Sequence, residues 1–136
     1  MTAIAFAFTR LNVIDLPSEE AFYSGVFGFN AVARVSEGEG ESAFDEVFLA
    51  LPNAGAAQCR LALIHYRNRP VPPPGEAVIG FMVENVAASV ARVEAAKGKT
   101  TLAPLTLPQH GLQIAYVQDP EGHTIELLQK LSATKP

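Results

Sequence analysis

The sequence contains no tryptophan, one cysteine, three histidines and no run of lysine or arginine. Its 10 basic and 14 acidic residues give a formal net charge of −4. Proteins that bind nucleic acid or an anionic membrane surface usually carry a basic patch, so neither partner is expected. The lone Cys59 cannot form a disulfide within the chain. Its apolar surroundings, CRLALI, predict a small buried side chain and a reducing compartment.

Long hydrophobic runs are missing as well. The N-terminal stretch MTAIAFAFTRLNVI is apolar, but it has no basic n-region and no small-residue cleavage site, and it alternates like a strand. We therefore expect neither a signal peptide nor a membrane span, and a cytoplasmic location. The 136 residues are 49% hydrophobic, which suits one compact domain or two fused half-domains.

The first half of the chain predicts one strand, one helix and three further strands. The helix is expected to begin after Asp15, a good N-cap, and to end at Gly28. The predicted strands cover residues 5–13, 29–35, 44–51 and 57–66. The polar segment SEGEGES predicts an exposed hairpin loop. The stretch RNRPVPPPGE is linker-like, because consecutive prolines exclude both a helix and a central strand.

The same order of elements begins again after the prolines. AVIGFMV is a predicted strand, Asn85 caps the helix VAASVARVEAAKG, and Gly98 closes it. A short strand near Thr100, the loop APLTLPQHG and two strands on either side of DPEGH complete this half.

An internal repeat links the two halves. At a constant separation of 70 positions, the matching pairs are Leu11 with Phe81, Val13 with Val83, Asp15 with Asn85, and Leu16 with Val86. The sequence therefore predicts an α+β fold of two β-α-β-β-β modules. The first module covers residues 1–66, a Pro-rich linker covers 67–75, and the second module covers 76–136.

Three segments carry a family resemblance: LNVIDLPSEEAFYSGVFGF in the first module, and GFMVENVAASVARVEAAKGK with AYVQDPEGHTIELL in the second. With this combination the chain resembles the vicinal oxygen chelate superfamily, which includes glyoxalase I, bleomycin-resistance proteins and extradiol dioxygenases. The resemblance covers about residues 5 to 130 and is specific for the fold rather than the reaction. It implies curved mixed sheets around a cavity, with the helices on the outer face and the site formed by paired modules.

The resemblance also implies where a metal would bind. Metal-dependent members take ligands from the first and last strand of each module, usually His or Gln and then Glu. The matching positions here are Phe8, Ala62, Val78 and Glu126. A catalytic metal normally has about three protein ligands, so one carboxylate predicts no divalent metal cofactor. His65, His110 and His123 show no ligand spacing, and His123 is expected on the surface of the DPEGH turn.

Strand alternation predicts which side chains share the cavity face with those positions. The expected polar anchors are Arg10, Asn12, Arg60, Tyr116 and Glu126, and the expected apolar walls are Phe8, Val78, Met82 and Leu128. Such a mixture is usual for a small-molecule site. The family resemblance adds that Tyr116 matches a cavity tyrosine of the dioxygenase branch.

Each polar anchor also has a purely structural interpretation. Arg10 and Arg60 are solvated on the opposite face if the register shifts by one residue. Tyr116 is also explained by core packing with its hydroxyl at the rim. An unpaired Glu126 is costly to bury between aliphatic neighbours. It is therefore either a functional cavity group near Tyr116 or a first-module arginine, or a family relic held in a salt bridge.

Two main functions follow as hypotheses. The first is a metal-free small-molecule-binding protein of the bleomycin-resistance type. The second is a glyoxalase-like lyase or isomerase, with Glu126 and Tyr116 as the catalytic candidates and Arg10 or Arg60 stabilising an oxyanion. A metal-dependent glyoxalase or dioxygenase is disfavoured by the missing ligands. Acidic residues cluster in SEGEGESAFDE rather than in a groove, which weakens drug resistance in particular. A homodimer is expected, because exposed strand edges invite pairing.

Overall fold

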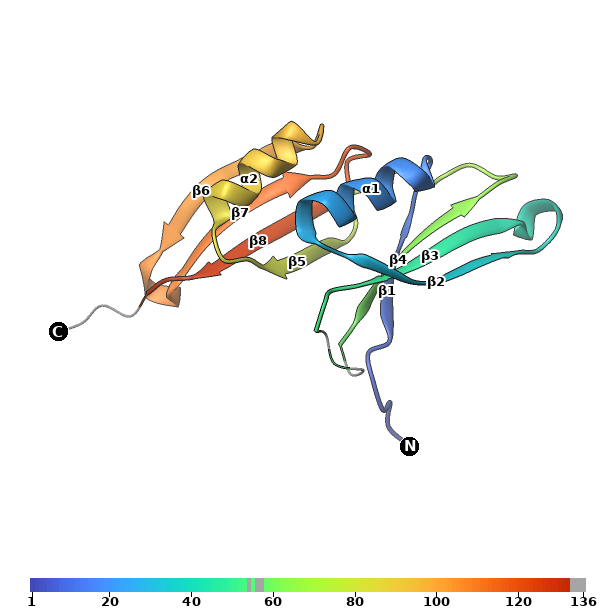
Figure 1. The fold of residues 1–136 in the computed structure, drawn as a ribbon, viewed down its shortest axis with the longest axis horizontal. Helices are drawn as coiled ribbons and strands as arrows, with labels where there is room; N and C mark the ends of the chain where they lie inside the picture. Colours follow the sequence, from blue (N-terminus) through green and yellow to red (C-terminus); the bar gives the residue numbers. More distant parts are fainter. Residues whose placement is uncertain (54, 56–57, 133–136) are drawn as a thin grey trace. The chain divides into compact units, whose positions relative to one another are not determined.

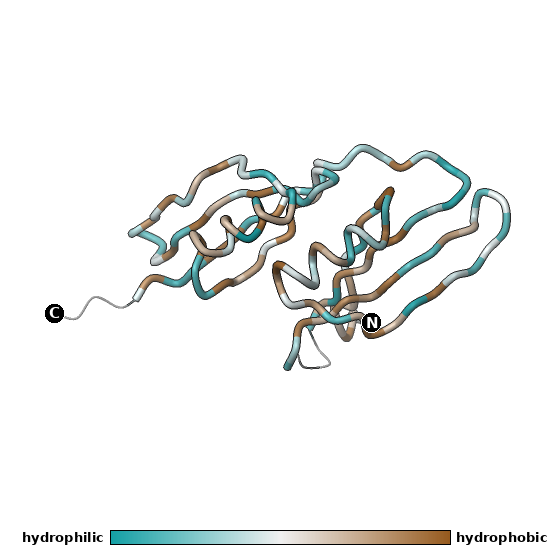
Figure 2. The backbone as a smooth tube through the Cα atoms, turned by 45° about the horizontal axis from the view of Figure 1, so that its top comes forward, coloured by the Kyte–Doolittle hydropathy of each residue, from teal (hydrophilic) through white to brown (hydrophobic). Residues whose placement is uncertain are grey.

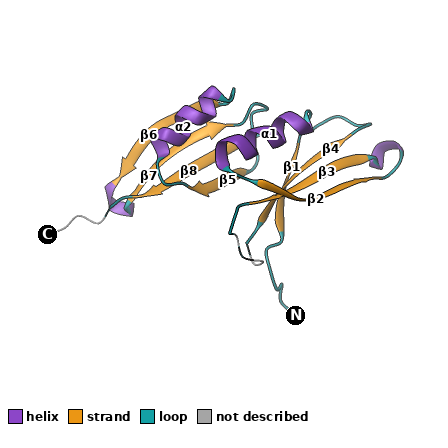
Figure 3. Ribbon diagram, in the orientation of Figure 1, coloured by secondary structure: helices purple, strands orange, loops and turns teal. Residues whose placement is uncertain are grey.

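The computed structural model describes residues 1–53, 55 and 58–132. The chain divides into two compact units, Met1–Pro73 and Pro74–Pro136. Within the described residues each unit has one four-stranded mixed sheet and one α-helix, which is the predicted α+β fold of two modules (Figure 3). Neither of these two helices is long and apolar enough to cross a lipid bilayer.

Unit 1 forms a sheet with the strand order β1-β4-β3-β2 (Figure 1). Its parallel pair is β1 (Phe8–Asn12) with β4 (Arg60–Tyr66). The antiparallel hairpin consists of β2 (Asn30–Glu37) and β3 (Phe44–Ala50), and β3 also pairs with β4. Helix α1 (Leu16–Phe27) follows β1 and packs against β3 and β4. The predicted order of elements is therefore correct in this unit.

The first strand is shorter than predicted. Residues 5–7 are not part of β1, although the carbonyl of Ala7 still accepts a hydrogen bond from the amide of Arg60 at 3.1 Å. Ile4 and Phe6 are largely exposed, so the alternating apolar residues of this segment do not form a buried strand face. The start of the fourth predicted strand, at position 57, lies outside the described residues.

Helix α1 begins and ends at its predicted caps. The side chain of Asp15 accepts a hydrogen bond from the amide of Ser18 at 3.1 Å, which satisfies a free N–H of the first turn. This hydrogen bond is the main reason that the pKa of Asp15 is lowered. Gly28 has a φ of 80°, and its amide bonds to the carbonyl of Ser24 at 3.1 Å. A left-handed residue at this position favours glycine, which has no Cβ to clash.

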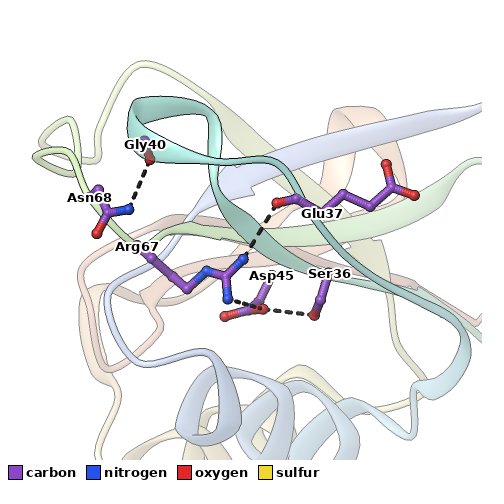
Figure 4. Close-up of polar contacts among 6 residues, drawn as sticks. All are labelled: Ser36, Glu37, Gly40, Asp45, Arg67 and Asn68. Atoms are coloured by element: carbon purple, nitrogen blue, oxygen red, sulfur yellow. Dashed lines mark hydrogen bonds and ion pairs between the residues drawn. The ribbon is translucent and has the colours of Figure 1, made fainter.

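The hairpin loop between β2 and β3 is exposed, as predicted, and contains a short 3-10 helix, η1 (Gly40–Ser42). The chain that leaves β4 holds this loop. The side chain of Asn68 donates to the carbonyl of Gly40 at 2.8 Å, and Arg67 donates to the carbonyl of Glu37 at 3.4 Å (Figure 4). Neighbouring polar contacts join the side chains of Arg67, Asp45 and Ser36.

Unit 2 repeats the arrangement with the strand order β5-β8-β7-β6. Its parallel pair is β5 (Val78–Met82) with β8 (Thr124–Lys130). The antiparallel strands are β6 (Lys99–Leu107) and β7 (Leu112–Gln118), and β7 also pairs with β8. Helix α2 (Val86–Ala95) packs against β6, β7 and β8. Hydrophobic positions recur along the strands and helices of both units (Figure 2).

The C-terminal end of α2 differs from the prediction. The helix ends at Ala95, and Lys97 rather than Gly98 takes the left-handed conformation, with a φ of 73°. Gly98 is needed for a different reason. A Cβ there would lie 2.5 Å from Val93 Cγ1 and 2.5 Å from the carbonyl oxygen of Gln118. Close approach of the chain to α2 and β7, not helix termination, therefore accounts for this glycine.

The loop predicted at APLTLPQHG is mostly strand. β6 continues to Leu107, and only Pro108–His110 forms a short 3-10 helix, η2. The register with β7 shifts twice between Thr100 and Leu105, which leaves Pro104 outside the paired positions. A proline is tolerated on an edge strand where the ladder needs no N–H, so the proline does not end this strand.

Each sheet has one face against its helix and one opposite face, which we call the open face. On β8, Ile125 and Leu127 are fully buried and belong to the helix side, as predicted. Thr124, Glu126 and Leu128 alternate with them and lie on the open face.

The two units keep the repeat found in the sequence. β1 and β5 begin at Phe8 and Val78, and α1 and α2 begin at Leu16 and Val86, so both pairs of elements are 70 positions apart. Paired residues on neighbouring strands share a face. The central open-face sets are Arg10, Ala62 and Phe48 in unit 1, and Gly80, Glu126 and Tyr116 in unit 2.

Candidate functional site

The open face of unit 2 is apolar around one carboxylate. Residues that share this face, by register, are Val78, Met82, Leu102, Leu105, Ile114 and Leu128. Val78 and Met82 are more than half exposed, at 54% and 57%. Monomer surfaces seldom leave such aliphatic side chains together without a binding role. At the centre of this face lies Glu126, which is half-buried.

Glu126 has one hydrogen-bond partner among the described residues. The hydroxyl of Tyr116 on β7 donates to Glu126 Oε1 at 3.1 Å, which agrees with the expected proximity of the two side chains. The pKa of Tyr116 is raised, first because this hydrogen bond favours the protonated phenol and second because the carboxylate repels a phenolate. Tyr116 is therefore held as a neutral hydrogen-bond donor beside a negative charge.

Space beside this carboxylate comes from a glycine. Gly80 on β5 pairs directly with Glu126 on β8, so the two residues share the open face. A Cβ at position 80 would be 3.6 Å from Leu128 Cδ1, an ordinary contact, so neither packing nor backbone strain demands glycine there. The absent side chain leaves one flank of the carboxylate uncovered, which suits a group that receives a ligand.

The open face of unit 1 carries an ion pair. Arg10 on β1 donates from Nε to Glu46 Oε2 at 2.6 Å. The guanidinium also lies 4.8 Å from the ring centroid of Phe8, and Phe8 makes an edge-on contact with Phe48 at 5.3 Å. The Glu46 side chain is only 4% exposed, whereas that of Arg10 is 39% exposed. The arginine therefore neutralises a buried carboxylate while keeping access to solvent.

Sequence reasoning missed Glu46. Its signal is present in FDEVFLA, where Glu46 alternates with Phe44 and Phe48 and so must share their face. The acidic loop next to this strand hides the pattern, because Glu46 looks like the last member of an exposed charge cluster. Only the pairing of both β1 and β3 with the strand between them, β4, brings Glu46 within reach of Arg10.

The predicted site residues fall into two sets, one in each unit. Phe8, Arg10, Asn12 and Arg60 lie on the open face of unit 1 by their register with β4. Val78, Met82, Tyr116, Glu126 and Leu128 lie on the open face of unit 2. Strand alternation thus assigned all of these positions to one type of face, and their roles in binding or catalysis stay predictions.

Two other expectations about single residues were wrong. Cys59 is exposed, because it precedes β4 instead of lying inside it, and its sulfur is 3.7 Å from Thr9 Oγ1. His123 is buried, at 7% exposure, and not on the surface. Its Nδ1 lies 2.8 Å from Asp119 Oδ2, while Asp119 Oδ1 accepts from the amides of Glu121 and His123. The aspartate thereby organises the DPEGH turn, which a sequence pattern of turn residues does not reveal.

The four family metal positions do not form a ligand set. Phe8, Ala62 and Val78 have no side-chain donor atom, and the Phe8 ring packs on Phe48. Glu126 is the one carboxylate among them, and it accepts the Tyr116 hydrogen bond. These residues do not fit a divalent metal bound in the family's way, since about three protein ligands are usual.

The two β-α-β-β-β modules, each with polar groups on its open face, define the class of fold to which this chain belongs. Residues 5–127 match the family described as the Glyoxalase/Bleomycin resistance protein/Dioxygenase superfamily. The chain belongs to this superfamily. Comparison with curated proteins gave no significant match.

Solved structures show the same fold at low sequence identity. A glyoxalase family protein from Bacillus cereus has a TM-score of 0.82 at 16% identity, with 97% of each chain covered. A glyoxalase I mutant from Zea mays has a TM-score of 0.72 at 22% identity, covering 90% of this chain and 46% of that one. An antibiotic binding protein from a Streptomyces species has a TM-score of 0.69 at 22% identity, covering 96% and 98%.

Proposed function

We propose that this protein binds a small molecule on its open faces, without the family metal, and that Glu126 with Tyr116 is the polar focus. The observation that carries this proposal is a lone carboxylate in an exposed apolar face, with a tyrosine hydroxyl on one flank and a glycine on the other. A ligand with an N–H or O–H donor and an apolar body matches that surface. The structural likeness to an antibiotic binding protein supports a binding role.

The principal test replaces the carboxylate without changing its shape. Titration of ¹⁵N-labelled protein with benzylamine and with benzamide should shift amide signals of β5, β7 and β8. Glu126→Gln should weaken benzylamine binding by about tenfold, since one charged hydrogen bond is lost. Glu94→Gln is the matched control, because Glu94 is an exposed carboxylate on α2. Unchanged binding by Glu126→Gln would refute the role of this carboxylate.

A second candidate function is a glyoxalase-like lyase or isomerase with Glu126 as acid or base. The observation that favours it is the Tyr116 hydrogen bond, since a hydroxyl donor beside a carboxylate can stabilise the charge that forms during proton transfer. Turnover of a 2-oxoaldehyde adduct that is lost in both Glu126→Gln and Tyr116→Phe would support catalysis. Binding without turnover would contradict the catalytic function and support only the binding function.

The absence of a metal requirement is a separate proposal. Because three of the four family positions lack a donor atom, we expect purified protein to hold far less than one metal ion per chain. Added zinc, nickel, iron or manganese should raise the Tm very little. Elemental analysis that finds one tightly held ion per chain, removed by chelator with loss of ligand binding, contradicts the proposal.

We also propose a homodimer in the cytoplasm. The edge strand β2 is exposed along most of its length and contains no proline, and such an edge favours association with a second chain. Light scattering at micromolar concentration should give twice the 14.5 kDa chain mass. A monomer mass across that range contradicts the assembly, and fractionation of the producing cells tests the compartment.

A further inference from the structure

We propose that the open face of unit 1 holds a carboxylate-binding site centred on the guanidinium of Arg10, with Glu46 as its positioning residue. The inference rests on the proposed small-molecule function and adds the chemical class of one ligand group. The ligand group is a carboxylate joined to an apolar body.

The first argument is the orientation of Arg10. Its Nε is bound to Glu46 Oε2 at 2.6 Å, and Glu46 is its one acidic partner among the described residues. The terminal guanidinium nitrogens carry four further N–H donors, arranged as a planar fork that matches a carboxylate. Since Glu46 is buried and Arg10 is 39% exposed, the fork is fixed from inside the sheet and open to solvent.

The second argument is the local charge. Arg60 pairs with Phe8 and lies two positions before Ala62, which pairs with Arg10, so both arginines lie on the open face of unit 1. Glu46 cancels one of the two positive charges. The remaining positive charge suits a monoanion. A carboxylate is therefore a better match than a dianionic phosphate, which would leave net negative charge beside buried Glu46.

The third argument is the aromatic surface next to the fork. The Phe8 ring lies 4.8 Å from the guanidinium carbon and is 39% exposed, and Phe48 supports it from the side. A ligand whose carboxylate engages Arg10 can place its apolar part on Phe8. Charge and apolar area are thus adjacent, as in most sites for small organic anions.

Arg34 provides a matched control within the same unit. It lies on the β2 edge, and both of its terminal nitrogens already bind the carboxylate of Glu20, at 2.8 Å and 2.6 Å. This fork is occupied, whereas among the described residues the guanidinium of Arg10 has an acidic partner only at Nε. An effect of general surface charge would be the same for both arginines.

The test compares three probes of one shape: benzoate, benzamide and benzylamine. Two-dimensional NMR follows the amide signals of β1 and β4 and the Nε–Hε signal of Arg10. We expect benzoate to bind unit 1 at least tenfold more tightly than benzamide. Arg10→Lys keeps the charge beside Glu46 but removes the fork, and should weaken benzoate at least fivefold. Arg34→Lys should leave the affinity for benzoate unchanged.

The role of Glu46 is tested by the direction in which its substitution changes benzoate affinity. Glu46→Leu makes the face more positive, which by itself strengthens anion binding, yet loss of the anchor should weaken benzoate several-fold. Glu46→Gln keeps an acceptor for Nε and should restore most of the affinity. Circular dichroism checks folding, and the wild-type comparison of benzoate with benzamide needs no variant.

Several outcomes overturn the proposal. Benzoate binding no tighter than benzamide contradicts it, and so does an equal loss in Arg10→Lys and Arg34→Lys. Tighter benzoate binding by Glu46→Leu refutes the positioning role. Benzamide and benzylamine can shift the amide signals of β5, β7 and β8 while benzoate leaves the signals of unit 1 unchanged. In that case this inference fails and the proposed function stands. If no probe shifts either open face, both fail.

Discussion

At equivalent strand positions, the two units carry side chains of different length and opposite charge. In unit 1 the long Arg10 pairs with the small Ala62, whereas in unit 2 the absent side chain of Gly80 pairs with the long Glu126. The backbone pairing is the same in both. One sheet therefore presents a cation bound to a buried carboxylate, and the other presents a carboxylate whose one hydrogen-bond partner among the described residues is a hydroxyl. Strand register conserves position, and it leaves the sign of the charge free to diverge.

The largest expected effect contrasts a glycine that follows α2 with a glycine inside α1. Gly98→Ala puts a Cβ 2.5 Å from Val93 and Gln118, so we expect it to lower the free energy of unfolding by about 3 kcal/mol. Gly25→Ala in α1 meets nothing within 4 Å and should stabilise by up to about 1 kcal/mol. Urea denaturation measures both. Equal effects would show that the α2 end is not tightly packed.

The next effect contrasts the two carboxylates. Arg10→Met leaves the buried Glu46 without its cation and should cost about 2 kcal/mol, less than a fully buried pair because Arg10 is partly exposed. Glu126 has no cation partner among the described residues, so Glu126→Gln should change the free energy of unfolding by less than about 0.5 kcal/mol. Urea denaturation at neutral pH provides the comparison. A larger loss in Glu126→Gln would make Glu126 the structural carboxylate.

A smaller effect concerns the tyrosine of unit 2. The folded pKa of Tyr116 is raised, so its contribution to stability is complete below the ordinary tyrosine pKa and is lost as pH rises through the folded value. Glu126→Gln removes the negative charge and should move this titration to lower pH. Ultraviolet absorbance, with Tyr116→Phe subtracted, follows the phenol. An unchanged titration in Glu126→Gln would mean that the carboxylate does not control Tyr116.

The smallest effect contrasts the helix caps. Asp15 and Asn85 occupy the same cap position, and each accepts from the amide three residues later, but only Asp15 titrates. Its lowered pKa adds stability above the ordinary carboxyl pKa that is lost as pH falls through the folded value. Between pH 5 and pH 2 the Tm of the wild type should therefore fall further than the Tm of Asp15→Asn, by on the order of 3 °C. Identical pH profiles would contradict this.

Much of the fold was predictable because it depends on local chemistry. Asp15 and Gly28 mark the two ends of α1 because both are capping residues. The 70-residue repeat follows from the positions where strands end and helices begin. Glu126 was predictable as an open-face residue because Ile125 and Leu127 must face the helix.

The remaining features depend on pairing between distant strands. The Arg10 to Glu46 contact joins residues 36 positions apart, and no local pattern links them. The exposure of Cys59 depends on where β4 begins. His123 is a different case: its partner Asp119 is four positions away, but the turn pattern DPEGH does not reveal that the histidine is buried. Gly98 looks like a helix terminator, but its reason is the approach of Gln118 from β7.

The irregular path of β6 has a consequence for how the sheet of unit 2 can grow. Pro104 lies within this edge strand, outside the paired positions, and has no N–H to offer a further strand. An incoming chain would meet two register shifts and a missing donor within a few residues. The free edge of β6 is thus a poor template for strand addition and protects against fibre-like aggregation. The β2 edge, with one shift and no proline, lacks this safeguard.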